Sequence, residues 1–178
     1  MTVVIDGTTG IDTIADNTVT SAKIMNGAVL PVDTQVGALP SMVRLNTANG
    51  YGSTNTKIRR FTNVVTNQGT DITYADSATL GASFTINTNG VYAISYSDTF
   101  SSTLTLGLSL NTSSPTTSIY LLPVAEILSV SINAFAAYGG HVSAALYLPS
   151  GSVVRAHTEG GVTGANPNQC QFVITRVA

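Results

Sequence analysis

The chain has 178 residues with a formal net charge of −2, and 9% of its residues are charged while 43% are hydrophobic. Roughly a quarter of the residues of an average soluble domain are charged, and a disordered chain is rich in charge and poor in apolar groups, so neither description fits. Lys57, Arg59 and Arg60 form the only cationic cluster, which we interpret as a solvated strand end, and we expect no nucleic-acid partner.

The first 40 residues predict an extended N-terminal arm without a core of its own. Residues 14–19 (IADNTV) are echoed ten positions later by residues 24–29 (IMNGAV), so apolar residues recur at every fifth position. This spacing fits neither an α-helix nor a plain strand. One interpretation is that three chains wind their repeats about a common axis, and the other is an irregular arm with two segments that are similar by coincidence.

In either case the arm needs a surface to lie against. We expect its apolar residues to form a trimer stem or to dock to a larger particle: Ile5, Ile11, Ile14, Val19, Ile24 and Val29.

Residues 41–178 predict a head domain of short strands separated by turns. Strands 82–86 and 91–97 form a hairpin in this prediction, with Asn89-Gly90 as its turn, and strands 141–148 and 152–158 are joined at Pro149-Ser150-Gly151. Further strands are expected at 57–65, 72–77, 104–110, 126–138 and 170–177. Eight to ten strands at this spacing are typical of an all-β antiparallel sandwich or jelly roll.

Alternation along these strands predicts which side chains face inward. We expect one set of large apolar residues to fill the core of the head or to pack between the subunits of a trimer: Phe84, Tyr92, Ile94, Tyr96, Leu146 and Phe172.

The sequence shows no pattern of catalytic or metal-binding residues. His141 and His157 lie in predicted strands without a neighbouring acid or nucleophile, which indicates core or interface histidines. Cys170 is the only cysteine and can form neither an intrachain disulfide nor a metal site alone. We therefore expect no enzyme, no cofactor and no metal site. The acidic residues of the head are isolated from one another in sequence: Asp71, Asp76, Asp98, Glu126 and Glu159.

The surface carries two further indications. A domain with so few charges must cover its exterior with Thr, Ser and Asn or bury it against partners, which favours an oligomer. The polar loop 160–168 is of the kind that carries recognition, although it is equally suited to a plain connection. Four tyrosines near loops or strand ends could stack on sugars or pack at a trimer interface: Tyr51, Tyr74, Tyr120 and Tyr138.

The N-terminal sequence has no basic region followed by an apolar run, and the longest apolar stretches are shorter than a membrane span. We expect synthesis in the cytoplasm and no membrane insertion.

Three segments carry a resemblance to a known superfamily. Residues 84–96 (FTINTNGVYAISY), 143–155 (SAALYLPSGSVVR) and 172–177 (FVITRV) resemble the jelly-roll heads of the tumour-necrosis-factor (TNF) and complement superfamily. Residues 17–24 (NTVTSAKI) are similar to stem sequences of bacteriophage fibre proteins, which often end in such heads.

The resemblance implies a homotrimer whose arm docks to a capsid or tail protein of a phage particle. A long tail fibre has more shaft repeats than the two present here, so the expected protein is a capsid decoration, a head fibre or a short fibre knob of the virion. A fibre tip that binds a host receptor or a host-surface glycan is the alternative, but the resemblance transfers no ligand residue.

Overall fold

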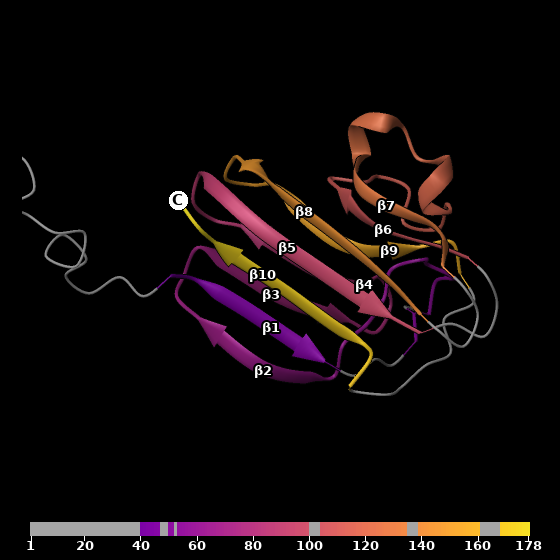
Figure 1. Ribbon diagram of the computed structural model, residues 1–178, viewed down its shortest axis with the longest axis horizontal. Coiled ribbons are helices and arrows are strands. Elements are labelled where there is room, and N and C mark those ends of the chain that lie inside the picture. Colours follow the sequence, from indigo (N-terminus) through magenta and orange to yellow (C-terminus); the bar gives the residue numbers. More distant parts are fainter. Residues whose placement is uncertain (1–39, 47–49, 52, 100–103, 135–138, 161–167) are drawn as a thin grey trace, which may run out of the picture. The chain divides into compact units, whose positions relative to one another are not determined.

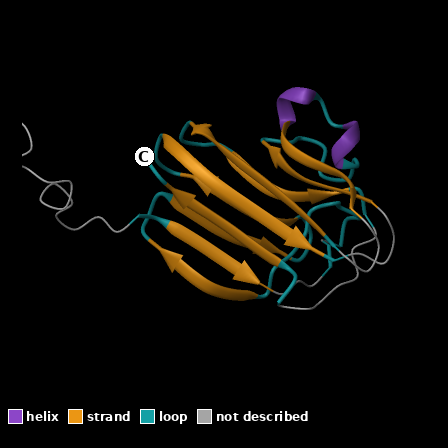
Figure 2. Ribbon diagram, viewed as in Figure 1, coloured by secondary structure: helices purple, strands orange, loops and turns teal. Residues whose placement is uncertain are grey.

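In the computed structural model, the described residues are 40–46, 50–51, 53–99, 104–134, 139–160 and 168–178. The predicted arm, with all six of its apolar residues from Ile5 to Val29, lies outside them, as do Tyr138 and most of loop 160–168. The described residues contain ten strands and two short 3₁₀ helices, and Figure 2 shows how little of this part of the chain is helical.

The strands form two five-stranded antiparallel sheets. We call them the front and back sheets after their positions in Figure 1. The front sheet has the order β2 (Asn63–Gln68), β1 (Met42–Asn46), β10 (Gln171–Arg176), β5 (Gly90–Asp98) and β8 (Gly140–Leu148). The back sheet has the order β3 (Ile72–Ser77), β4 (Gly81–Ile86), β9 (Val153–Thr158), β6 (Leu104–Leu110) and β7 (Ile127–Ala134). The short helices η2 (Ile119–Leu121) and η3 (Val124–Glu126) lie in the connection from β6 to β7.

This arrangement confirms the all-β jelly-roll sandwich. Strands β3 and β6 have the predicted bounds, whereas the single strand predicted at 57–65 is wrong. Ile58 and Arg59 make only isolated bridges, and β2 begins at Asn63. Strand β1 was not anticipated, because five residues give too short an alternation to stand out.

The predicted hairpin of strands 82–86 and 91–97 is also wrong, and the strands joined at Pro149-Ser150-Gly151 do not pair with each other either. Strand β4 lies in the back sheet and β5 in the front sheet, and likewise β8 lies in the front sheet and β9 in the back sheet. The two turns therefore carry the chain across the sandwich. They also pack together, since Ile86 N–H donates to the Ser152 carbonyl at 2.8 Å and Gly151 N–H donates to the Ile86 carbonyl at 2.8 Å.

Aromatic side chains from both sheets fill the space between the layers. The rings of Phe84 (back sheet) and Phe172 (front sheet) are stacked, with centroids 3.9 Å apart, and Phe61 and Tyr96 pack around Phe172. Strand β5 alternates strictly, so Tyr92, like Tyr96, faces the core. Of the predicted core or trimer-packing residues, Phe84, Tyr92, Ile94, Tyr96 and Phe172 are buried in this core, and Leu146 is half-buried against it.

No helix in the described part of the chain has the length and hydropathy needed to cross a membrane.

Candidate functional site

The most polar interior feature is a buried ion pair between Arg59 and Asp98. Both side chains are 0% exposed, and the guanidinium donates through Nε to Oδ2 at 2.6 Å and through one terminal nitrogen to Oδ1 at 3.2 Å. The Tyr96 hydroxyl also donates to Oδ2 at 2.7 Å, and Thr99 N–H donates to Oδ1 at 2.8 Å. The interpretation of Arg59 as part of a solvated strand end is therefore wrong.

The side chains of this cluster stabilise the fold, and none of them is activated for chemistry. Burial raises the pKa of Tyr96 well above its ordinary value and raises the pKa of the Cys170 thiol to about 12. A thiol with such a pKa stays protonated at neutral pH and is a poor nucleophile. The carboxylate of Asp98 accepts four hydrogen bonds, which occupy its acceptor sites.

The imidazole of His157 also stabilises the fold, because both of its ring nitrogens form hydrogen bonds within the head. Its Nε2 donates to the Thr117 carbonyl at 2.7 Å and its Nδ1 accepts from the Ser109 hydroxyl at 3.0 Å. These partners satisfy a neutral imidazole, and desolvation lowers the pKa of His157 to about 4. His157 lies beneath the connection from β6 to β7 and holds that segment against the back sheet.

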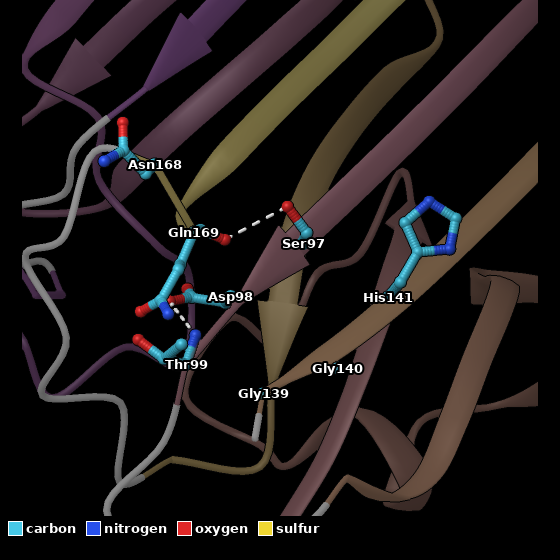
Figure 3. Close-up of a pocket in the computed structure, with 8 residues that line it drawn as sticks. All are labelled: Ser97, Asp98, Thr99, Gly139, Gly140, His141, Asn168 and Gln169. Carbon is cyan, nitrogen blue, oxygen red and sulfur yellow. Dashed lines mark hydrogen bonds between the residues drawn. The ribbon is translucent and has the colours of Figure 1, made fainter. Parts of the chain in front are cut away.

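A shallow pocket of about 470 Å³ opens where β5 and β8 meet the residues that precede β10. Figure 3 shows the Ser97 hydroxyl directed to the Gln169 carbonyl and Thr99 N–H directed to Asp98. The exposed His141 ring points away from Asp98 in this view and instead lies 3.0 Å from the Ser95 hydroxyl. The pocket thus offers hydrogen-bonding groups but no acid–base pair. Eight residues line it: Ser97, Asp98, Thr99, Gly139, Gly140, His141, Asn168 and Gln169.

Among the described residues, no cluster of three or more His, Cys, Asp or Glu side chains could hold a metal ion. The described tyrosines from the loop prediction differ in their surroundings. Tyr51 bonds Thr158 at 2.7 Å, Tyr74 packs on Phe84 and donates to the Phe61 carbonyl at 2.8 Å, and Tyr120 is 51% exposed. Of these three, only Tyr120 is exposed, and the other two are half-buried.

The outer face of the front sheet is the broadest candidate surface. The strand registers place outward residues in rows across β1, β10, β5 and β8, and every one of them is exposed or half-buried. The rows are Met42–Thr175–Ala93–Ala145, Arg44–Val173–Ser95–Ser143 and Asn46–Gln171–Ser97–His141. A further short row adds Val91 and Tyr147, with Val177 N–H donating to the Val91 carbonyl beside them.

This face, which we call the front face, changes in character along the strands. At the end near Pro40 it is apolar, and Val177 and Tyr147 are 58% and 61% exposed. At the opposite end, next to the pocket, it carries amide and hydroxyl groups. These rows contain no carboxylate, and Arg44, His141 and Tyr147 are their titratable side chains, so the face carries very few charged groups.

The back sheet differs because the connection from β6 to β7 covers part of its outer side. Gly107 makes this possible, since a Cβ there would come within 2.6 Å of Ile119 Cγ1 and 2.9 Å of the Ser129 carbonyl oxygen. Sequence alternation predicted the inward residues of β5 and therefore, by exclusion, its outward ones. The cross-strand registers that join the outward residues into the front face cannot be read from a single sequence.

Solved structures share this fold. The crystal structure of murine APRIL at pH 8.0 matches with a TM-score of 0.53 and 11% identity, covering 78% of this chain and 100% of APRIL. The structure of murine APRIL at pH 5.0 matches with a TM-score of 0.52 and 12% identity over the same shares. APRIL is a TNF-family ligand, so the TNF-like form of the jelly roll is shown. No protein-family model and no curated protein matches the sequence.

Proposed function

We propose that this chain is a non-enzymatic structural protein of a phage virion. Its head domain forms a homotrimer, and the arm of residues 1–40 anchors the trimer to a capsid or tail protein as a capsid decoration, a head fibre or a short fibre knob. The front face is the observation that carries this proposal, because it is broad, nearly uncharged and apolar toward its end near Pro40.

Burial supplies the energy of self-association. Covering apolar surface contributes about 25 cal/mol per Å², and the front face contains few charges whose desolvation would oppose contact. Large exposed side chains such as Tyr147 are common anchors of protein interfaces. A TNF-like jelly roll that exposes such a face is suited to packing against identical copies.

A single charge placed on the front face tests its role in self-association. Ala145 is exposed in the isolated chain, so Ala145→Arg leaves the fold intact but buries an unpaired guanidinium in the proposed interface, and we expect the trimer to dissociate. Ala75→Arg is the matched control, because Ala75 is an exposed strand alanine on the back sheet. A trimer that survives Ala145→Arg, or dissociates equally with Ala75→Arg, would contradict the assignment.

Deletion of residues 1–30 tests the anchoring role of the arm. The apolar arm residues Ile14, Val19, Ile24 and Val29 have no predicted core of their own and need a surface outside the arm. We expect the truncated protein to fold and trimerise but to be absent from purified particles. Truncated protein that still decorates particles at the normal level would disprove docking through the arm.

A host-surface glycan is a second candidate partner, favoured by the polar pocket at Ser97, Asn168 and Gln169. The pocket lies at the end of the front sheet opposite Pro40, where an anchored head would face away from the particle. A glycan array with the full-length trimer, repeated with Gln169→Ala, tests this candidate. Glycan binding that is lost with Gln169→Ala would support the glycan as a partner. If no glycan binds, only the structural role remains.

A further inference from the structure

The geometry points to a second copy of this chain as the partner of an exposed apolar corner at residues 119–125. The corner of one copy packs on the front face of the next copy, which makes the trimer contact head-to-tail. This inference rests on the proposed trimer and identifies the second half of its interface.

The corner contains three of the nine large apolar side chains that are exposed among the described residues. Tyr120, Leu121 and Val124 are 51%, 63% and 87% exposed, and all three fall within five consecutive residues. Pro123 and Ala125 between and beside them are also exposed. A contiguous exposed apolar patch of this kind marks an interaction site more often than scattered single residues do.

The corner is held rigidly, so its exposure is not that of a loose loop. Ile119 is 0% exposed and Leu122 is 6% exposed, and these two side chains anchor the segment from below. Leu121 N–H donates to the Ser118 carbonyl at 2.9 Å, and Glu126 N–H donates to the Pro123 carbonyl at 2.8 Å. A preorganised surface loses little conformational entropy on binding, which favours its use as an interface.

Further contacts fix the corner to the back sheet. The Ser118 hydroxyl donates to the Glu159 carbonyl at 3.2 Å, and His157 bonds the neighbouring Thr117 carbonyl. The absent side chain of Gly107 lets Ile119 approach the sheet closely. Figure 1 shows the two short helices standing beside β7, the edge strand of the back sheet.

Charge excludes the other common partners of apolar loops. Between Asp98 and Arg155 the sequence contains one charged residue, Glu126, and no Lys or Arg. Among the described residues, the one cation bonded to this connection is Lys57, whose backbone N–H donates to the Pro115 carbonyl at 2.7 Å, and a single cation is too few to hold an anionic lipid surface or a nucleic acid. The complement of the corner must be apolar and nearly uncharged, and the front face has this character at Val91, Ala93 and Tyr147.

Symmetry requires two different surfaces in such a contact. A self-complementary patch produces a two-fold dimer, whereas a closed ring of three needs a heterologous contact in which one surface of each copy meets a different surface of the next. The front face belongs to one layer of the sandwich and the corner is attached to the other layer. Together they supply the two unlike apolar surfaces of a head-to-tail contact.

Site-specific photocrosslinking of the full-length chain tests this inference. A benzophenone amino acid replaces Val124, copies labelled with ¹⁵N are mixed with unlabelled copies, and crosslinked peptides of mixed isotope content identify contacts between chains. We expect crosslinks from position 124 to front-face peptides in β5, β8 or β10 of another copy. The same label at Leu80, which is 46% exposed on the connection from β3 to β4, serves as the control and should give no such crosslink.

Crosslinks within one chain only, crosslinks between position 124 of two copies, or crosslinks that form only in particles to a different protein would each overturn the inference. Leu121→Asp with Val124→Asp should raise the concentration of half-dissociation at least about tenfold, which is a change of about 2.7 kcal/mol per mole of trimer, and Leu80→Asp should not. If the trimer dissociates with Ala145→Arg but not with the substitutions in the corner, the role of the corner in the trimer contact is refuted, while the proposed function stands. A wild-type chain that is monomeric would overturn both.

Discussion

Asp98→Asn should be among the most destabilising isosteric substitutions in the head. The change keeps the size of the side chain and an acceptor for Thr99 N–H, but it removes the negative charge that faces Arg59. Both partners are 0% exposed and the pair is joined by contacts of 2.6 and 3.2 Å. The guanidinium would remain charged in the core, because an arginine side chain does not deprotonate in proteins.

The size of the effect follows from the cost of an unpaired buried charge. Removing one partner of a buried pair typically costs about 3–5 kcal/mol, against a total stability of about 5–15 kcal/mol for a domain. The melting temperature should fall by about 10 °C. Asp76→Asn is the control, because the Arg60–Asp76 pair is 20% and 22% exposed and such surface pairs are worth about 1 kcal/mol or less.

Urea unfolding followed by circular dichroism at a fixed protein concentration provides the assay. Arg59→Met in the Asp98→Asn background removes the unpaired positive charge from the core and should restore at least half of the lost stability. The reasoning fails if Asp98→Asn costs no more than Asp76→Asn, or if the Arg59 and Asp98 changes destabilise additively.

Three other substitutions address the core and the corner. Burial lowers the pKa of His157 to about 4, so between pH 6.5 and 4 the unfolded chain binds a proton that the folded chain does not, and stability should fall over this range by about 3 kcal/mol. Urea titrations at pH 7 and pH 4.5 cover most of this range and should show a loss of about 2 kcal/mol, which His157→Gln should abolish and His141→Gln should not. Gly107→Ala places a Cβ 2.6 Å from Ile119 Cγ1 and should cost about 1–3 kcal/mol, and unchanged thermal unfolding would contradict the close packing of the corner. Phe172→Ala removes the ring stacked on Phe84 and should cost about 3–5 kcal/mol by chemical denaturation; a loss below about 1 kcal/mol would show that the stack is not central to the core.

The features that depend on local alternation could be predicted from the sequence. Residues 90–98 alternate between small or polar and large apolar side chains, and the structure buries Tyr92, Ile94 and Tyr96 as that period requires. The same alternation does not reveal which sheet a strand joins. The turn at 87–89 could close a hairpin or cross the sandwich, and only the packing of Phe84 against Phe172 between the layers selects the crossing.

Long-range pairs left no local signal. Arg59 and Asp98 are 39 positions apart, so their pairing cannot be read from local sequence. Two consecutive arginines in an otherwise polar segment are typical of a solvent-exposed segment, which is why Arg59 was expected at the surface. The apolar corner was equally inaccessible, since Ile119–Ala125 contains consecutive apolar residues without a period. Which of them face outward is decided by Gly107 and by the bonds from His157 and Ser118, all of which come from tertiary contacts.

Sedimentation equilibrium of the full-length chain at micromolar concentration tests most directly whether identical copies cover each other's uncharged faces. A species of three times the 18.3 kDa chain mass, converted to smaller species by Ala145→Arg but not by Ala75→Arg, is the predicted result. A stable and soluble 18.3 kDa monomer under the same conditions would contradict the account.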